Sequence, residues 1–111
     1  MAKKPNKKKL ILPKKTPIND LILFSIHLIV SNNEKCDFER LVKECFTIFT
    51  DVFGLSRYPH WPDCRKLDRP LRTLRAEKLI KGDPKTIFTL TSEGRQRALE
   101  IARTLKQGKL L

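Results

Sequence analysis

The segment Leu21–Val30 constrains the fold more than any other part of the chain. Its sequence, LILFSIHLIV, has only Ser25 and His27 as polar residues. A helix that is apolar nearly all round is buried nearly all round, and in a chain of 111 residues we expect a partner subunit to cover one side of it. The segment is about half as long as a membrane-spanning helix. We therefore expect a cytoplasmic protein with no membrane partner.

Hydrophobic periodicity and turn residues predict a mainly α fold with a small β-hairpin. Thr16 is expected to cap the first helix with Pro17 as its first residue, and Asp37 to cap the second. The predicted helices run from 16–17 to about 31, over about 38–51, and over 69–78 after a short turn at 63–67. Strands are predicted over 79–81 and 86–90 around the turn 82–85. Thr91 or Ser92 would cap a last helix, which Gly108 ends.

Pro70 leaves two readings of the third helical pattern open. Leu67, Leu71 and Leu74 fall on one side of a helix, whereas proline is tolerated only in a first turn. Either a longer helix is kinked at Pro70, or Asp68 caps a helix that a short turn precedes. We favour the second reading.

The net charge of +12 predicts a polyanionic partner, because 24 Lys and Arg stand against 12 Asp and Glu. The excess lies in two zones, residues 1–15 and residues 57–81. Lysine-dense sequence gains little from burial, so we expect residues 1–15 to be a disordered basic arm. Residues 16–107 would form one domain, and residues 108–111 a short tail.

The cysteines and histidines give little support for a metal site. An odd cysteine count of three without a CxxC motif indicates reduced thiols. His60 and Cys64 are four residues apart, but structural zinc takes four ligands and only His27, Cys36 and Cys45 could complete the set. No catalytic motif is present either. We expect no metal, no cofactor and no enzymatic activity.

The end of the chain carries a pattern shared with known DNA-binding proteins. The stretch LDRPLRTLRAEKLIKGDPKTIFTLTSEGRQRALEIA begins at Leu67 and resembles winged helix-turn-helix regulators of the MarR and PadR type. In those proteins a recognition helix ends in a Leu-x-x-x-x-Leu-Ile phrase, here residues 74–80. The wing returns on a strand ending Leu-Thr, here Leu90-Thr91, and glycine follows three residues later, here Gly94.

The resemblance covers about residues 16–106 and implies three helices, a two-stranded wing and a C-terminal helix. Two features depart from it. Lys78 stands where such families have glycine, so we expect the recognition helix to end without a glycine-type C-cap. The connection from Gly54 to Pro62 is also longer than a tight helix-turn-helix turn, and it is rich in aromatic residues and proline.

On this resemblance the third helix turns its leucines to the core and its arginines outward. A helix fits the major groove of DNA, where arginine can donate two hydrogen bonds to guanine and threonine can touch a thymine methyl. The wing and the arm would lie on phosphates. The residues expected to bind nucleic acid are Arg65, Lys66, Arg69, Arg72, Thr73 and Arg75, then Lys81 and Lys85 in the wing, and Lys7, Lys8 and Lys9 in the arm.

The function expected from these residues is double-stranded DNA binding, as a transcriptional regulator or an accessory protein at the nucleoid. The first and last helices would form a homodimer on a palindromic site, and no small-molecule ligand is expected. One alternative is an interaction subunit of a larger nucleic-acid-processing complex. Another is an RNA or single-strand binder that uses Tyr58 and Trp61, although we favour packing in the loop or the core for both rings.

Overall fold

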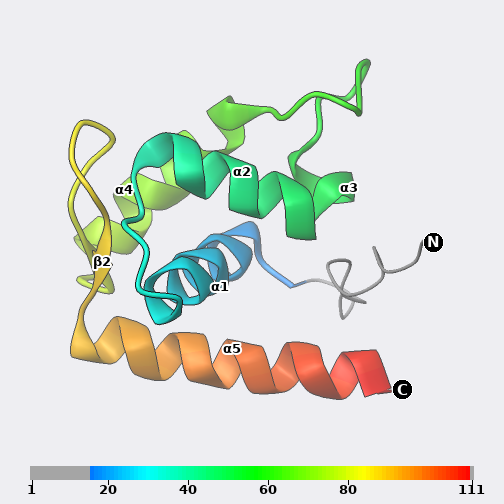
Figure 1. Ribbon diagram of the computed structural model, residues 1–111. Coiled ribbons are helices and arrows are strands. Elements are labelled where there is room, and N and C mark those ends of the chain that lie inside the picture. The colour runs from blue at the N-terminus through cyan, green and yellow to red at the C-terminus, as the bar shows by residue number, and fades with distance from the viewer. Residues whose placement is uncertain (1–15, 111) are drawn as a thin grey trace.

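The computed structural model describes residues 16–110, with side chains as far as Leu105, so the predicted arm lies outside the described residues. The described part is mainly helical with a two-stranded antiparallel sheet, as the sequence predicts (Figure 1). In chain order the elements are α1 (Ile18–Ser31), α2 (Phe38–Ile48), α3 (Thr50–Phe53), the 3-10 helix η2 (Cys64–Leu67), α4 (Asp68–Ala76), β1 (Ile80–Lys81), β2 (Thr89–Leu90) and α5 (Ser92–Leu110).

Helix α1 is the centre of the fold. Figure 1 shows it between α2 and α5, and it also packs against α4 and β2. The apolar residues Leu21–Phe24, Ile26 and Ile29 are all buried. Leu28 and Val30 are half-buried against the core, so the chain covers most of this helix by itself. The large hydrophobic side chains that are exposed in the described residues belong to other segments.

Two details of α1 follow from its surroundings. The helix begins at Ile18 with Pro17 in the cap position, so the predicted Thr16 cap is one residue too early. Ser25 is fully buried, and its hydroxyl donates to the carbonyl oxygen of Leu21 at 2.9 Å. This bond satisfies the polar atom inside the core.

The second predicted helix is broken in two. Asp37 caps α2 as expected, because its carboxylate accepts from the backbone N–H of Arg40 at 2.8 Å. The helix ends at Ile48, and α3 begins after the break at Phe49. The ring of Phe49 is buried. Its centroid lies 6.2 Å from the ring centroid of Phe24 and 6.4 Å from that of Phe53. The backbone of Phe49, with φ of −120° and ψ of 55°, leaves the helical conformation and interrupts the helix that periodicity alone would continue.

The favoured reading of the third helical pattern is confirmed. The short turn is η2, capped by Asp63, whose carboxylate accepts from the N–H of Arg65 at 3.2 Å. Helix α4 then begins at Asp68, which is its first residue and not its cap. Pro70 falls in the first turn, where its missing N–H has no helical partner to lose.

The end of α4 corrects one expectation. Lys78 adopts the left-handed conformation with φ of 62°. The N–H of Leu79 donates to the Leu74 carbonyl at 3.0 Å, and that of Lys78 to the Arg75 carbonyl at 2.9 Å. These two bonds form the Schellman motif that usually places glycine at the left-handed position. The helix keeps the glycine-type C-cap with a lysine in it, at a cost of roughly 1–2 kcal/mol.

The hairpin is shorter than predicted, and its second strand is joined to the rest of the fold. Ile80 pairs with Leu90, and Lys81 with Thr89. Beyond the paired residues, the N–H of Phe88 donates to the carbonyl of Cys36 at 2.8 Å. The segment before α2 therefore fixes the hairpin's second strand against the helical core.

Helix α5 closes the other side of α1. Thr91 is its cap, because its hydroxyl accepts from the N–H of Gly94 at 3.0 Å. A Cβ on Gly94 would lie only 1.9 Å from the carbonyl oxygen of Leu79, so this close approach requires glycine. The helix continues past Gly108 to Leu110, which makes the predicted end at Gly108 wrong. None of the described helices has the length and apolar content that crossing a membrane requires.

Candidate nucleic-acid interface

The exposed face of α4 is the main candidate site. Leu67, Leu71 and Leu74 are at most 2% exposed and fix the helix to the core. Because residues on a helix recur every 3.6 positions, the same arrangement turns Arg69 and Arg72 to solvent, where both are exposed. The division of α4 into a leucine face and an arginine face is as the sequence predicts.

Arg69 is the freest cation of this face. Within the part of the chain whose side chains are described, it makes no hydrogen bond or ion pair. Arg72 donates to the carboxylate of Asp68 at 2.9 Å, but the two side chains are 64% and 66% exposed. An exposed pair at this helical spacing is worth about 0.3–0.5 kcal/mol. Arg72 can therefore exchange Asp68 for a phosphate or a base at little cost.

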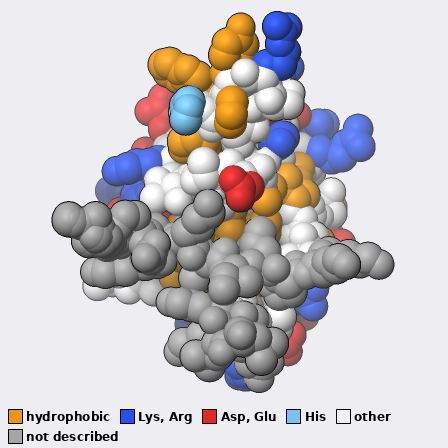
Figure 2. Space-filling model, turned by 90° about the vertical axis from the view of Figure 1, so that its right-hand side faces the viewer, with side chains coloured by type: hydrophobic (Ala, Val, Ile, Leu, Met, Phe, Trp, Pro, Cys, Tyr) orange, Lys and Arg blue, Asp and Glu red, His pale blue; other side chains and the backbone are white. Residues whose placement is uncertain are grey.

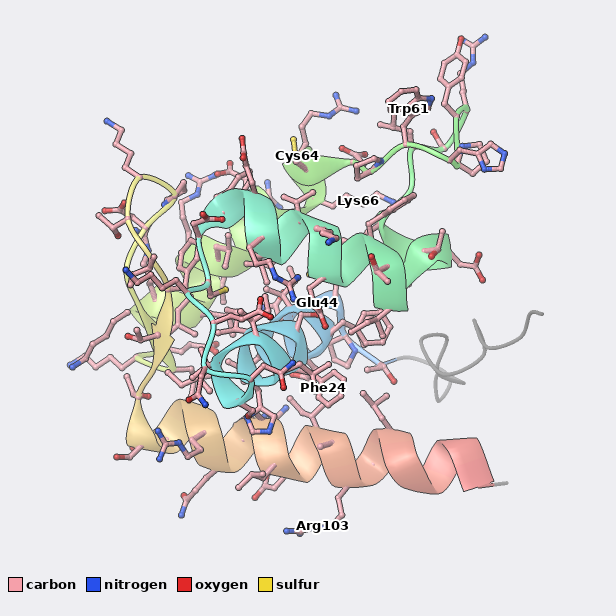
Figure 3. The ribbon with its side chains drawn as sticks, viewed as in Figure 1. Phe24, Glu44, Trp61, Cys64, Lys66 and Arg103 are labelled. Carbon is pink, nitrogen blue, oxygen red and sulfur yellow. The ribbon has the colours of Figure 1, made fainter. Side chains whose placement is uncertain are left out.

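Arg65 and Lys66 precede α4 and differ in what their side chains contact. The Arg65 guanidinium lies 3.2 Å from the carboxylate of Asp63, which is only 11% exposed, while Arg65 itself is 83% exposed. Lys66 is half-buried, and its ammonium donates to the Val52 carbonyl at 2.7 Å. That carbonyl belongs to α3, so Lys66 joins the 3-10 turn to the preceding helix (Figure 3). Of these two predicted ligands, Arg65 is accessible and Lys66 has a structural contact.

Arg75 and Thr73 lie at the border of the face, and both are half-buried. The Arg75 guanidinium donates to the carbonyl of Gly82 at 3.2 Å. This contact joins the last turn of α4 to the hairpin and fixes the position of one relative to the other. Arg75 thus acts first as a positioning residue for the hairpin.

The hairpin presents two exposed lysines, Lys81 and Lys85. Its turn is well ordered by hydrogen bonds. The N–H of Thr86 donates to the Asp83 carbonyl at 3.0 Å, and the N–H of Lys85 to the Asp83 carboxylate at 2.8 Å. The aspartate that dilutes the positive charge of the tip is therefore also the residue that shapes it.

A groove joins the hairpin to α4 and α5. It encloses about 800 Å³, is open to solvent, and is lined by Arg75, Lys78 and Lys81 together with the first residues of α5. Lys78 is a cation that sequence reasoning did not include among the ligands. Lys78 is the last variable position of the Leu-x-x-x-x-Leu-Ile phrase, and a residue at the C-terminal end of a helix that leads into a wing lies close to that wing.

Residues 55–62, called the aromatic loop below, contradict the expectation that their rings pack. Trp61 is 65% exposed and Tyr58 is 60% exposed. The loop projects from the helical body between α3 and η2 (Figure 1), and Figure 2 shows hydrophobic side chains gathered at the top of the molecule beside Lys and Arg. The neighbouring Arg57 is also exposed. The sequence signal for the exposure of these rings is the lack of apolar residues at helical or strand spacing around them.

The cysteines are separated by burial. Cys36 and Cys45 are buried, and burial raises the pKa of both thiols to about 12. Cys64 is exposed, as is His60. In the part of the chain that the structure describes, no group of three or more potential metal ligands lies together.

Comparisons with protein-family models, with curated proteins and with solved structures found no match to this chain.

Proposed function

We propose that the protein binds double-stranded DNA through α4, as a winged helix whose wing is the β1–β2 hairpin. The observation that carries the proposal is the two-faced α4. Leu71 and Leu74 hold one face in the core while Arg69 and Arg72 stand on the other. The Arg75 contact to Gly82 keeps the hairpin beside the end of the same helix. A major groove and its flanking phosphates can meet such an arrangement together.

The roles follow from the chemistry of each side chain. Arg69 and Arg72 can each donate two hydrogen bonds to guanine O6 and N7, and the Thr73 methyl can touch a thymine methyl. Arg65, Lys81 and Lys85 would bind phosphates, which fixes the register without reading sequence. Lys7, Lys8 and Lys9 would add phosphate contacts from outside the described residues. Lys66 is left out of this set because Val52 already holds its ammonium.

The proposed role is that of a transcriptional regulator or a DNA-binding accessory protein at the nucleoid, without enzymatic activity, cofactor or small-molecule ligand. Homodimer formation stays part of the proposal because half-sites one helical turn apart are read by dimers. The structural argument for a homodimer is weaker than the argument from sequence, since most apolar residues of α1 are buried within one chain. The same burial disfavours docking of α1 on another protein, which was the alternative of an interaction subunit.

Electrophoretic mobility shifts test the proposal. A random-sequence duplex, a single strand and double-stranded RNA of equal length would each be titrated at two salt concentrations. We expect duplex DNA to bind at moderate salt, with affinity falling as salt rises because released counterions favour binding. Absence of duplex binding at moderate salt would contradict the proposal.

Deletion of residues 1–15 separates the arm from α4. The arm carries seven lysines and no acid, so its loss should weaken all duplexes to a similar degree and flatten the salt dependence, by about one unit of slope per lost phosphate contact. A deletion that changed sequence preference would assign base contacts to the arm and contradict its role as a phosphate anchor.

A further inference from the structure

The aromatic loop is folded before any partner arrives. The N–H of Leu55 donates to the Trp61 carbonyl at 2.9 Å, and the N–H of Trp61 to the Tyr58 carbonyl at 3.0 Å. Below them, the N–H of Asp63 donates to the Phe53 carbonyl at 2.7 Å. A Cβ on Gly54 would lie 2.7 Å from the carbonyl oxygen of Pro59, so backbone meets backbone at the base. The loop is closed by its own main chain.

Two large aromatic side chains of this loop are exposed to solvent. Trp61 and Tyr58 keep 65% and 60% of their surface exposed, although burial of aromatic side chains is among the most favourable contributions to folding. A loop that only connected α3 to η2 would have no need of them. A rigid loop that presents aromatic rings has the properties of a binding surface, because little ordering entropy remains to be lost when a partner binds.

The charge around the rings favours an anionic partner. Residues 55–62 contain Arg57 and His60 but no aspartate or glutamate. The next acid, Asp63, is nearly buried and is held by Arg65, whose guanidinium is exposed at the base of the loop. Trp, Tyr and Arg are also frequent at protein interfaces. Here, however, the surplus of positive charge extends along the chain into α4, which points to nucleic acid.

The loop lies at the N-terminal end of the proposed recognition helix. It leads directly into η2 and α4, and Figure 3 shows Trp61 and Cys64 along the same edge of the molecule, with Lys66 beneath them. A nucleic acid bound to Arg65 and Arg69 would therefore pass the aromatic loop at one end of the contact. Paired bases are stacked inside the duplex and offer no free face to a ring, whereas unpaired bases do.

We propose that the aromatic loop stacks on unpaired bases next to the duplex that α4 binds, so that the preferred ligand is a junction between double-stranded and single-stranded DNA. This inference rests on the proposed function, because α4 has to hold the duplex part. Trp61 and Tyr58 would each accept one base face, and Arg57 would meet the strand's phosphates. Stacking of this kind tolerates any base sequence.

Trp61 supplies the reporter for a direct test, because it is the single tryptophan of the chain. Three labelled DNAs share one duplex: one is blunt, one carries a single-stranded extension, and one carries an extension of equal length without bases. Anisotropy of the label reports binding, and Trp61 emission reports stacking. We expect quenching only with the extension that has bases, and tighter binding of that DNA than of the other two.

Variants then separate stacking from charge. Trp61→Ala should lose about 5- to 150-fold in affinity for the extended duplex, from the known cost of removing one stacked base contact, with little change for the blunt duplex. Trp61→Phe, which keeps a ring, should recover most of the loss. Since the Trp61 side chain is exposed and only its backbone closes the loop, both variants should keep the thermal midpoint of the parent.

The two proposals fail in different ways. If no DNA with a duplex part binds, the proposed function fails. If all three DNAs bind equally and Trp61 emission does not change, the junction inference is overturned, and the loop becomes a surface for a protein partner. If the extension without bases gains as much affinity as the one with bases, the gain comes from phosphates, and stacking is again overturned.

Discussion

Helices α2 and α4 are both amphipathic and both carry arginine, but Arg40 of α2 and Arg69 of α4 differ in how their charge is paired. On α2, Arg40 bridges Glu34 and Glu44 with contacts of 2.7 Å each, and its side chain is only 25% exposed. These carboxylates raise the pKa of Arg40 further above its ordinary value. On α4, Arg69 is exposed and has no such partner among the described side chains.

The difference shows that a basic composition does not by itself define an anion-binding surface. A cation already held by two carboxylates gains little from a phosphate, whereas an unpartnered arginine beside Arg72 is repelled by its neighbour until an anion arrives. Arg97 on α5 is intermediate, since its guanidinium lies 3.3 Å from Asp20 and its side chain is 49% exposed. The α4 face combines an unpaired arginine, Arg69, with a weakly paired one, Arg72, one helical turn apart.

The largest expected effect concerns the buried side of α4. Leu71→Ala removes a side chain that is 2% exposed and should lower the free energy of unfolding by about 2–5 kcal/mol. Urea denaturation measures this. Leu99→Ala is the control, because Leu99 is 45% exposed on α5 and its loss should cost well under half as much. Equal losses would contradict the placement of α4.

The buried thiol on α2 gives native stability a dependence on pH. Burial raises the pKa of Cys45 on α2 to about 12, above its unfolded value of 9.0. At this thiol the unfolded chain therefore ionises first, and Cys45 alone should lower native stability by about 1.4 kcal/mol per pH unit as pH rises from about 9 toward 12. Cys45→Ala should remove this share of the slope in urea denaturation curves recorded across this pH range, and the share of Cys36, whose pKa is also raised to about 12, should remain.

The same thiols differ in access to reagents. A thiol reagent added to the native protein at neutral pH should modify Cys64 alone, and all three cysteines in denaturant. Rapid native modification of Cys36 or Cys45 would contradict the burial of the α2 side.

Removal of the paired arginine tests the other half of the comparison. Arg40→Ala leaves Glu34 and Glu44 without their shared partner and should cost about 1 kcal/mol of stability, because the pair is partly exposed. Lys43→Ala removes the same charge from the exposed side of α2 and should change stability by less than about 0.5 kcal/mol. An Arg40→Ala variant with the free energy of unfolding of the parent would mean that this bridge contributes nothing to stability.

The smallest expected effect is at the end of α4. Lys78→Gly relieves the left-handed backbone at φ of 62° and should stabilise the protein by up to about 1 kcal/mol. Lys78→Ala removes the charge but keeps the strain, so it should give no gain. A gain with alanine equal to that with glycine would assign the effect to charge instead of conformation.

Much of the fold could be predicted because its signals are local. The helix order, the Asp37 and Thr91 caps and the leucines of α4 depend on residues within one or two turns. Three features depend on distant contacts and could not be predicted in this way. Cover for α1 comes from segments as far away as α5, and Lys66 is held by a carbonyl 14 positions earlier. The exposure of the Trp61 and Tyr58 rings depends on how far the loop projects from the helical body, which periodicity does not give.

The residues of the candidate site also fall into two groups, those that helical periodicity places and those that tertiary contacts place. Helical periodicity was enough to place Arg69 and Arg72 outward, since the leucines fix the opposite face. It could not show that Arg75 would contact the hairpin, because that contact joins residues seven positions apart through a turn. The exposed state of Arg57 and Lys78 depends on the same tertiary geometry.

Duplex binding by three arginine variants tests whether the exposed face of α4 binds DNA. Anisotropy of a labelled duplex, selected from a random library for preferred binding, would be measured with Arg69→Ala, Arg40→Ala and Arg103→Ala. Arg103 lies on α5 at the edge opposite Cys64 (Figure 3). We predict that Arg69→Ala loses about 1–3 kcal/mol of binding free energy, while the other two stay within about threefold of the parent. Equal losses in all three variants would show that net charge, and not the α4 face, binds the DNA.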